Sequence, residues 1–313
     1  MEMLKEPAIL FFILGMASVF FNTKLEIPNG LSRFLSLYFL FAIGFKGGVS
    51  LAKSGVEVEL LWCMLGGVLL SVSQALLISL GLAKLLPRAD AAAIGATYGS
   101  VSAVTFVAGV TWLESLQMPY LGGMTAVLAL MEAPAIVVAL LWYNRHSGRP
   151  SHLKALLHES FFNPSVYLLM GSLIIGLISG PFGRDSVATF VFDLFRGLLC
   201  FFLMDLGIRS GHVVKKMELP AWLVVGGFVF PIIGASLAIV WSYVVGLSAP
   251  QAFLLTTLGA GASYIAVPAA LQMAIPEARS GLYLTLALGI TFPFNITVGL
   301  PLYWWVIKQL LPL

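Results

Sequence analysis

The sequence of 313 residues is 59% hydrophobic and 10% charged, with a formal net charge of +3. Soluble domains carry roughly 25% charged residues, so 31 Asp, Glu, Lys and Arg side chains are too few to cover a soluble protein of this length. The composition predicts a polytopic membrane protein, and the small net charge gives no sign of nucleic-acid binding.

Ten stretches approach the roughly 20 mainly apolar residues that a spanning helix needs, and polar, Pro or Gly residues separate them. We expect all-α structure, with helices at about 6–22, 31–52, 57–85, 90–111, 118–143, 163–181, 186–210, 219–246, 250–274 and 280–310. Five helices precede the central hydrophilic loop and five follow it. The sequence therefore predicts a first five-helix unit at 1–145, a connecting loop at 146–160 and a second five-helix unit at 161–313.

A shift of 163 residues aligns three separate parts of the two halves. It places Ser100-Val-Ser-Ala-Val-Thr105 on Ser263-Tyr-Ile-Ala-Val-Pro268, Gly44-Phe-Lys-Gly-Gly48 on Gly207-Ile-Arg-Ser-Gly211, and Glu132 on Asn295. An odd number of helices per copy makes the second copy enter the membrane from the opposite side. The halves are therefore expected to be inverted repeats, an arrangement typical of secondary transporters.

The distribution of Lys and Arg predicts the orientation, because cytoplasmic loops carry an excess of these residues. One set of loops holds 11 of them: Lys24, Arg33, Lys84, Arg88, Arg145, Arg149, Lys154, Arg209, Lys215, Lys216 and Arg279. The other face holds five: Lys5, Lys46, Lys53, Arg184 and Lys308. We expect the first face to be cytoplasmic, with both termini on the outer side of the membrane.

Two small, polar stretches at 95–105 and 259–268 interrupt otherwise apolar spans. Glycine and small hydroxyl side chains weaken a helix, and Pro268 removes an N–H and clashes with the carbonyl of Tyr264. A broken helix leaves free N–H groups at the start of its second half, and these groups suit a small anion. Close packing between helices is the structural alternative. The recurrence of both stretches at one offset favours a paired binding site.

Glu132 and Asn295 occupy equivalent positions in apolar surroundings. An intramembrane carboxylate is a functional candidate by default, and carboxylate and carboxamide oxygens suit a hard cation such as Na⁺. A cation would also offset the charge of a bound anion. Two alternatives for Glu132 stay open: an interhelical hydrogen bond that supports the broken helices, and a proton relay.

The remaining intramembrane charges have structural interpretations. Asp193 and Arg196 are three residues apart, so they are predicted to pair on one helix face. Lys46 and Arg209 lie at equivalent repeat positions and are predicted to be helix-end anchors that reach the interface.

Cysteine and histidine indicate no metal site. Cys63 and Cys200 lie inside apolar spans and are predicted to pack there. His146, His152 and His158 follow at steps of six, which does not place them on one helix face. No phosphate loop, nucleophile elbow or zinc-protease motif occurs, so the sequence does not predict an enzyme.

Several motifs resemble the sodium-dependent bicarbonate transporters of cyanobacteria, the SbtA family, over nearly the whole chain. The motifs are Tyr98-Gly-Ser-Val-Ser-Ala-Val-Thr-Phe106, Ala262-Ser-Tyr-Ile-Ala-Val-Pro-Ala-Ala270, Pro276-Glu-Ala-Arg279, Gly281-Leu-Tyr-Leu284 and Leu288-Gly-Ile-Thr-Phe-Pro-Phe-Asn-Ile-Thr297. The resemblance implies ten helices in inverted repeats with a gate part and a core part, an elevator mechanism and a homotrimer in a bacterial inner membrane. It also implies bicarbonate between the broken helices and Na⁺ nearby, with no other cofactor or metal.

The positions that match these motifs give the candidate site. The predicted substrate-binding residues are Gly99, Ser100, Val101, Ser102, Ser263, Tyr264, Ile265 and Ala266. The predicted cation-binding residues are Ser102, Thr105, Glu132, Asn295 and Thr297. The central loop, about 17 residues here, is shorter than in the cyanobacterial proteins. This difference bears on the family's PII-like partner SbtB, which binds the cytoplasmic face.

The leading hypothesis from the sequence is a symporter that carries bicarbonate inward with Na⁺. A symporter for another small anion, or one coupled to H⁺, is the alternative within transport. A channel or a non-transporting sensor is the alternative from another class.

Overall fold

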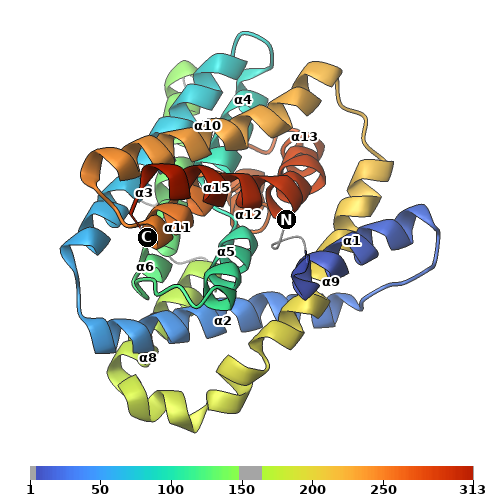
Figure 1. Ribbon diagram of the computed structural model, residues 1–313. Coiled ribbons are helices and arrows are strands. Elements are labelled where there is room, and N and C mark those ends of the chain that lie inside the picture. The colour runs from blue at the N-terminus through green and yellow to red at the C-terminus, as the bar shows by residue number, and fades with distance from the viewer. Residues whose placement is uncertain (1–4, 148–163, 313) are drawn as a thin grey trace.

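The computed structural model describes residues 5–147 and 164–312 (Figure 1). In these residues the chain is helical, and it contains no strand. His152 and His158, with most of the predicted connecting loop, lie outside the described residues.

The first half contains helices α1 (Pro7–Phe20), α2 (Asn29–Ser54), α3 (Val58–Leu82), α4 (Arg88–Gly99), α5 (Ala103–Ser115) and α6 (Met124–Ser147). The second half contains α8 (Pro164–Ser186), the π-helical turn η2 (Thr189–Asp193), α9 (Phe195–Lys215), α10 (Ala221–Val245), α11 (Ala249–Gly259) and α12 (Ala266–Ala274). A last continuous helical segment contains α13 (Ser280–Leu284), η3 (Thr285–Thr291), α14 (Phe292–Phe294), η4 (Asn295–Gly299) and α15 (Leu300–Leu310).

Eight helical segments among the described residues are long and apolar enough to cross a membrane. The segment that includes α4 and α5 counts as one of them, whereas α1 is shorter, and α11 and α12 are separate short helices. The structure is therefore that of an all-helical, multi-pass membrane protein, and the number of ten spans stays a prediction.

The predicted end of the sixth helix at 181 coincides with a break in α8. Gly180 has non-helical backbone angles (φ 52°, ψ −141°) and Pro181 follows it, so α8 consists of two helical pieces joined by a kink. The seventh predicted helix, 186–210, corresponds to η2 followed by α9, which ends at Lys215.

The equivalent glycines of the two halves pack against the first helix of the opposite half. Helix α2 lies along α8, and helix α9 lies along α1. A Cβ on Gly44 of α2 would lie 2.4 Å from the carbonyl oxygen of Leu169, and one on Gly207 of α9 would lie 2.1 Å from that of Phe12. Only glycine permits such close approach of two helix backbones. The repeated sequence motif therefore occupies corresponding packing positions.

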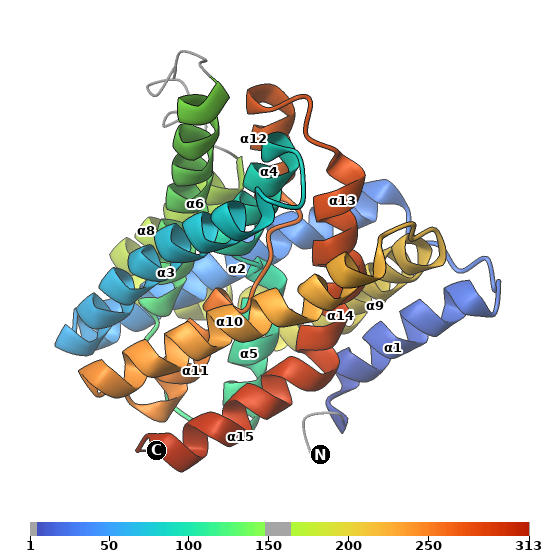
Figure 2. The same ribbon diagram turned by 90° about the horizontal axis from the view of Figure 1, so that it is seen from above.

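The four half-helices around the two interruptions run in opposite directions. Figure 2 shows α4 and α12 towards the upper edge of the molecule and α5 and α11 below them. The chain passes downward from α4 to α5 and upward from α11 to α12. The interruptions thus meet in the interior from opposite sides.

Candidate functional site

The first interruption lies between the end of α4 at Gly99 and the start of α5 at Ala103. The intervening backbone is extended, with φ and ψ of −86° and −173° at Ser100 and −104° and 104° at Ser102. The Ser102 hydroxyl accepts a hydrogen bond from the backbone N–H of Thr105 at 3.2 Å. Ser102 is therefore the N-cap of α5, a position where serine is strongly preferred.

The second interruption lies between the end of α11 at Gly259 and the start of α12 at Ala266. Pro268 cannot donate the N–H that would continue a helix through Tyr264, which explains the break in covalent terms. The Ser263 hydroxyl accepts from the N–H of Val267 at 3.3 Å, so it satisfies one early amide of α12. Both predicted stretches therefore interrupt their helices.

The two interruptions are in direct contact. The backbone N–H of Ser263 donates to the carbonyl oxygen of Thr97 at 2.9 Å, which links the start of α12 to the end of α4. A Cβ on Gly261 would lie 2.7 Å from the backbone nitrogen of Ser102, so this position accepts only glycine at the present backbone separation. The helix starts of α5 and α12 are thereby held side by side.

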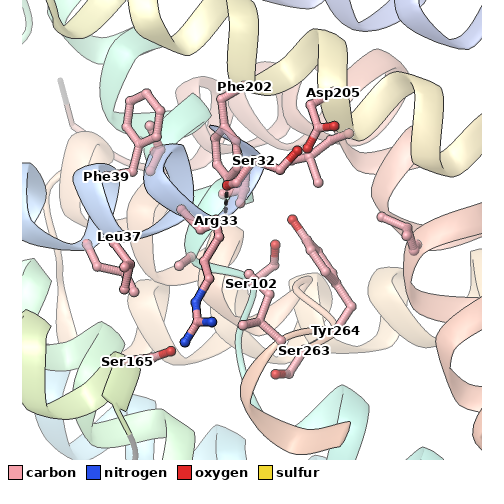
Figure 3. A pocket seen from close by; sticks show the side chains of 18 of the residues that line it. Ser32, Arg33, Leu37, Phe39, Ser102, Ser165, Phe202, Asp205, Ser263 and Tyr264 are labelled. Atoms are coloured by element: carbon pink, nitrogen blue, oxygen red, sulfur yellow. Dashed lines mark hydrogen bonds between the residues drawn. The ribbon is translucent and has the colours of Figure 1, made fainter. Parts of the chain in front are cut away.

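A cavity of about 710 Å³ opens beside the two helix starts (Figure 3). Its walls come from both interruptions and from α2, α5, α6, α8, α9, α13 and η3. Its polar and charged lining residues include Arg33, Ser36, Ser102, Glu132, Ser165, Asp205, Arg209, Ser263 and Tyr264. In Figure 3 the side chains of Ser102 and Tyr264 point into the cavity, and the guanidinium of Arg33 extends towards Ser165.

The Ser102 hydroxyl has both protein partners and a free direction towards the cavity. Its Oγ accepts from the backbone N–H of Thr105 and also from the Thr105 hydroxyl, at 2.9 Å. A hydroxyl has two acceptor sites and one donor, so the two bonds occupy its acceptor capacity. Its O–H can donate to the neighbouring Tyr264 hydroxyl or to an anion, and the early amides of α5 are further donors that suit an anion.

Charged side chains line the cavity as well. Arg209 bonds to Asp205, one helical turn away, with Nε 2.9 Å from Oδ2. Asp205 is buried, while Arg209 is 44% exposed in its side chain. Arg33 is also exposed. The cavity therefore presents two guanidinium groups and one ion-paired carboxylate.

Glu132 lies on α6 and lines the same cavity, with only 4% of its surface exposed. The Ser100 hydroxyl donates to its backbone carbonyl at 3.5 Å, which connects α6 to the first interruption. Glu132 is therefore a buried carboxylate residue that borders both the cavity and the first interruption.

The structure brings together most of the predicted site residues. Val101, Ser102, Glu132, Ser263, Tyr264 and Ile265 line the cavity. Gly99 and Ser100 are buried and do not line it, Thr105 bonds to Ser102, and Ala266 begins α12.

Asn295 and Thr297 lie elsewhere. The amide of Asn295 donates to the carbonyl of Ala260 at 2.7 Å, and its oxygen accepts from the Tyr303 hydroxyl at 3.0 Å. The hydroxyl of Thr297 donates to the carbonyl of Pro293 in its own helix, at 2.7 Å. Neither residue lines the cavity, and the assignment of the cation ligands stays a prediction.

The structure gives the intramembrane charges different partners from those predicted. Lys46 forms an ion pair with Glu114 at 2.7 Å, and Arg209 pairs with Asp205, so neither is a simple interfacial anchor. Asp193 and Arg196 are both exposed and form no ion pair with each other. Lys46 and Arg209 were singled out in the sequence because they are equivalent in the repeat. Arg33 was not predicted as a cavity residue, since it had entered only in the count of loop charges.

The fold and the site define a multi-pass membrane protein with a cavity beside two interrupted helices. The cavity lining is mainly apolar and carries a few polar and charged side chains, an arrangement typical of secondary transporters. The sequence profile of the Na⁺-dependent bicarbonate transporter superfamily matches residues 7–308. The chain therefore belongs to this superfamily. No match was found among individual curated proteins. Because the family is one of transporters, the protein is not an enzyme, and Na⁺ is a transported ion.

Proposed function

We propose that the protein is a symporter that carries bicarbonate into the cell with Na⁺, and that the anion binds between the starts of α5 and α12. The observation that supports this site most strongly is the contact of the two interruptions at the cavity wall, through Ser263 N–H and the Thr97 carbonyl. Two helix starts contribute unpaired amides and the positive ends of two helix dipoles. An anion removed from water needs such compensation.

In this proposal Glu132 binds the coupling Na⁺. The hydroxyl oxygens of Ser102 and Thr105 join it when the bonds that Thr105 now donates to Ser102 are exchanged for the cation. The carboxylate is buried on the cavity wall, and a cation beside the anion reduces the cost of burying either charge. Asn295 and Thr297 belong to the same predicted set. The present bonds of Asn295 support a role in fixing the carbonyl of Ala260 at the second interruption.

We further propose two inverted five-helix repeats that move as an elevator. Helices α1, α2, α8 and α9 form the static part in this scheme, and the interrupted helices belong to the moving part. The matched positions of Gly44 and Gly207 support the repeat, as do the opposite directions of the interrupted helices.

The orientation follows from the Lys and Arg counts, with both termini outside a bacterial inner membrane. The first turns of α2 and α8 then place the cavity mouth on the cytoplasmic side. The homotrimer and binding of the PII-like SbtB stay predictions from the family resemblance.

The test is uptake of radiolabelled bicarbonate by proteoliposomes that contain the purified protein. We expect accumulation when an inward Na⁺ gradient is imposed and little uptake when choline replaces Na⁺. Uptake that is indifferent to Na⁺ would disprove the coupling, and uptake that follows a proton gradient instead would support H⁺ symport. Currents without accumulation would indicate a channel. Competition by unlabelled carboxylates would show whether another anion is preferred.

A further inference from the structure

An ion pair connects α2 to α5 away from the cavity. The ammonium of Lys46 lies 2.7 Å from Oε1 of Glu114, and the Tyr120 hydroxyl donates to the same oxygen at 3.2 Å. Lys46 also lies 4.2 Å from the ring centroid of Phe195 on α9. Both charged side chains are largely buried, with 13% and 26% exposed. The pair thus joins one helix of the proposed static part to one of the proposed moving part.

The pair stands beyond the closed end of the cavity. On α2 the lining residues end at Ile43, and on α5 they end at Val107. Lys46 and Glu114 follow by about 5 Å and about 11 Å along their helices. The cavity is therefore open on one side of the two interruptions, and the ion pair lies on the other side.

A much smaller pocket lies on that other side. It measures about 10 Å³, and α1, α5 and α9 line it. Its lining includes Leu199 and Leu203, which are the repeat equivalents of Ser36 and Leu40 in the large cavity. Corresponding positions of the two halves therefore line a large cavity on one side and only a small pocket on the other.

The shift of 163 residues also relates two pairs of charges. It takes Lys46 to Arg209 and Glu114 to Glu277. In the present structure Lys46 and Glu114 form an ion pair. Their equivalents have other partners: Arg209 bonds to Asp205, and Glu277 accepts from the Tyr143 hydroxyl. The two equivalent pairs are thus in different states on the two sides.

We propose that these two ion pairs alternate during transport. Lys46 and Glu114 hold the far side closed while the cavity is open, and Arg209 and Glu277 pair when the far side opens and the cavity closes. This inference rests on the proposed inverted repeat and transport cycle. In such a protein the two end states exchange the environments of equivalent residues, so a contact made by one pair in one state is made by its equivalent in the other.

The test measures which side is open, without any substrate. In a background with Cys63→Ser and Cys200→Ser, the reporter Leu199→Cys is exposed to a membrane-impermeant maleimide added from the Glu114 side, in buffer free of Na⁺ and bicarbonate. We expect Glu114→Gln to raise the labelling rate roughly tenfold. The substitution removes the charge-assisted bond to Lys46, which exists only in the state with the large cavity open, and so favours the opposite state. We expect Glu277→Gln to lower the rate, because it removes the equivalent bond from the opposite state. The matched control is Glu57→Gln, since Glu57 is exposed on the Glu114 side. This variant should be labelled at the same rate as the reporter protein that keeps all its glutamates.

A charge swap separates pairing from general damage. Lys46→Glu should raise labelling as Glu114→Gln does, and Lys46→Glu combined with Glu114→Lys should restore the original rate. Opposite effects of Glu114→Gln and Glu277→Gln, with restoration by the swap, support the proposal. Equal effects, no effect, or no restoration would overturn it. Because labelling requires no transport, these outcomes are independent of whether bicarbonate and Na⁺ are the transported ions.

Discussion

Replacement of Ser102 or Ser263 by alanine tests the proposed anion site, because it removes only a hydroxyl group. The two hydroxyls cap α5 and α12 and line the cavity. Each substitution removes one polar group without adding volume. Ser36 provides the matched control, because it lines the same cavity but donates to the carbonyl of Ser32 in its own helix, at 3.0 Å.

The structure gives two separate magnitudes for Ser102→Ala. Loss of the cap to Thr105 costs about 1 kcal/mol of stability, which should lower the melting temperature slightly. Loss of a hydrogen bond from the hydroxyl to an anion costs about 1.5–3 kcal/mol. That cost raises the bicarbonate KM roughly 10- to 150-fold. Ser263→Ala should give a similar pair of effects, because its hydroxyl also caps a helix start.

The assay is Na⁺-driven bicarbonate uptake by proteoliposomes, with thermal stability measured on the same preparations. We expect Ser102→Ala and Ser263→Ala to raise KM while Ser36→Ala leaves it near the wild-type value. Ser102→Leu and Ser263→Leu should abolish uptake with normal expression, because a bulky apolar side chain fills the anion position. A wild-type KM in both alanine variants, or normal uptake by both leucine variants, would show that the hydroxyls only cap their helices.

Three further predictions concern the cation and the packing of the site. Glu132→Ala should raise the Na⁺ concentration for half-maximal uptake, measured in a Na⁺ titration, because it removes an oxygen ligand; an unchanged Na⁺ response would exclude the carboxylate from the cation site. Gly261→Ala should destabilise the protein by about 1–3 kcal/mol in thermal unfolding, since its Cβ would lie 2.7 Å from the Ser102 nitrogen. The control Gly281→Ala has open space and should be neutral, so equal melting temperatures for both would refute the packing. Asp90→Ala should lower the melting temperature by breaking its bonds to the backbone and guanidinium of Arg279, at 2.8 Å each, and wild-type stability would mean that the pair contributes nothing.

The sequence predicted the interruptions because their causes are local. Pro268 lacks an N–H, and Ser102 and Ser263 stand where a helix start needs a cap. Glu132 was found for a similar reason, since a carboxylate in an apolar span is costly and has few structural explanations.

The partners of the charged residues could not be predicted, because they depend on which helices meet. Lys46 and Glu114 are 68 residues apart, and no local spacing relates them. The rule for neighbouring charges on a helix selected Asp193 and Arg196, which are exposed and form no ion pair with each other. The same rule fits Asp205 and Arg209, four residues apart on α9, and the structure pairs these two. By contrast, the break at Gly180 and Pro181 was predicted because its cause is local, although the short helical piece that follows it to Ser186 was not.

A cryo-EM map of the protein in Na⁺ and bicarbonate would locate the anion directly. We expect density for a small planar ligand between Ser102 and Ser263, within hydrogen-bond distance of backbone N–H groups at the starts of both α5 and α12. Bicarbonate bound at another place, or contacts made by one helix start alone, would contradict an anion site shared by the two helix starts.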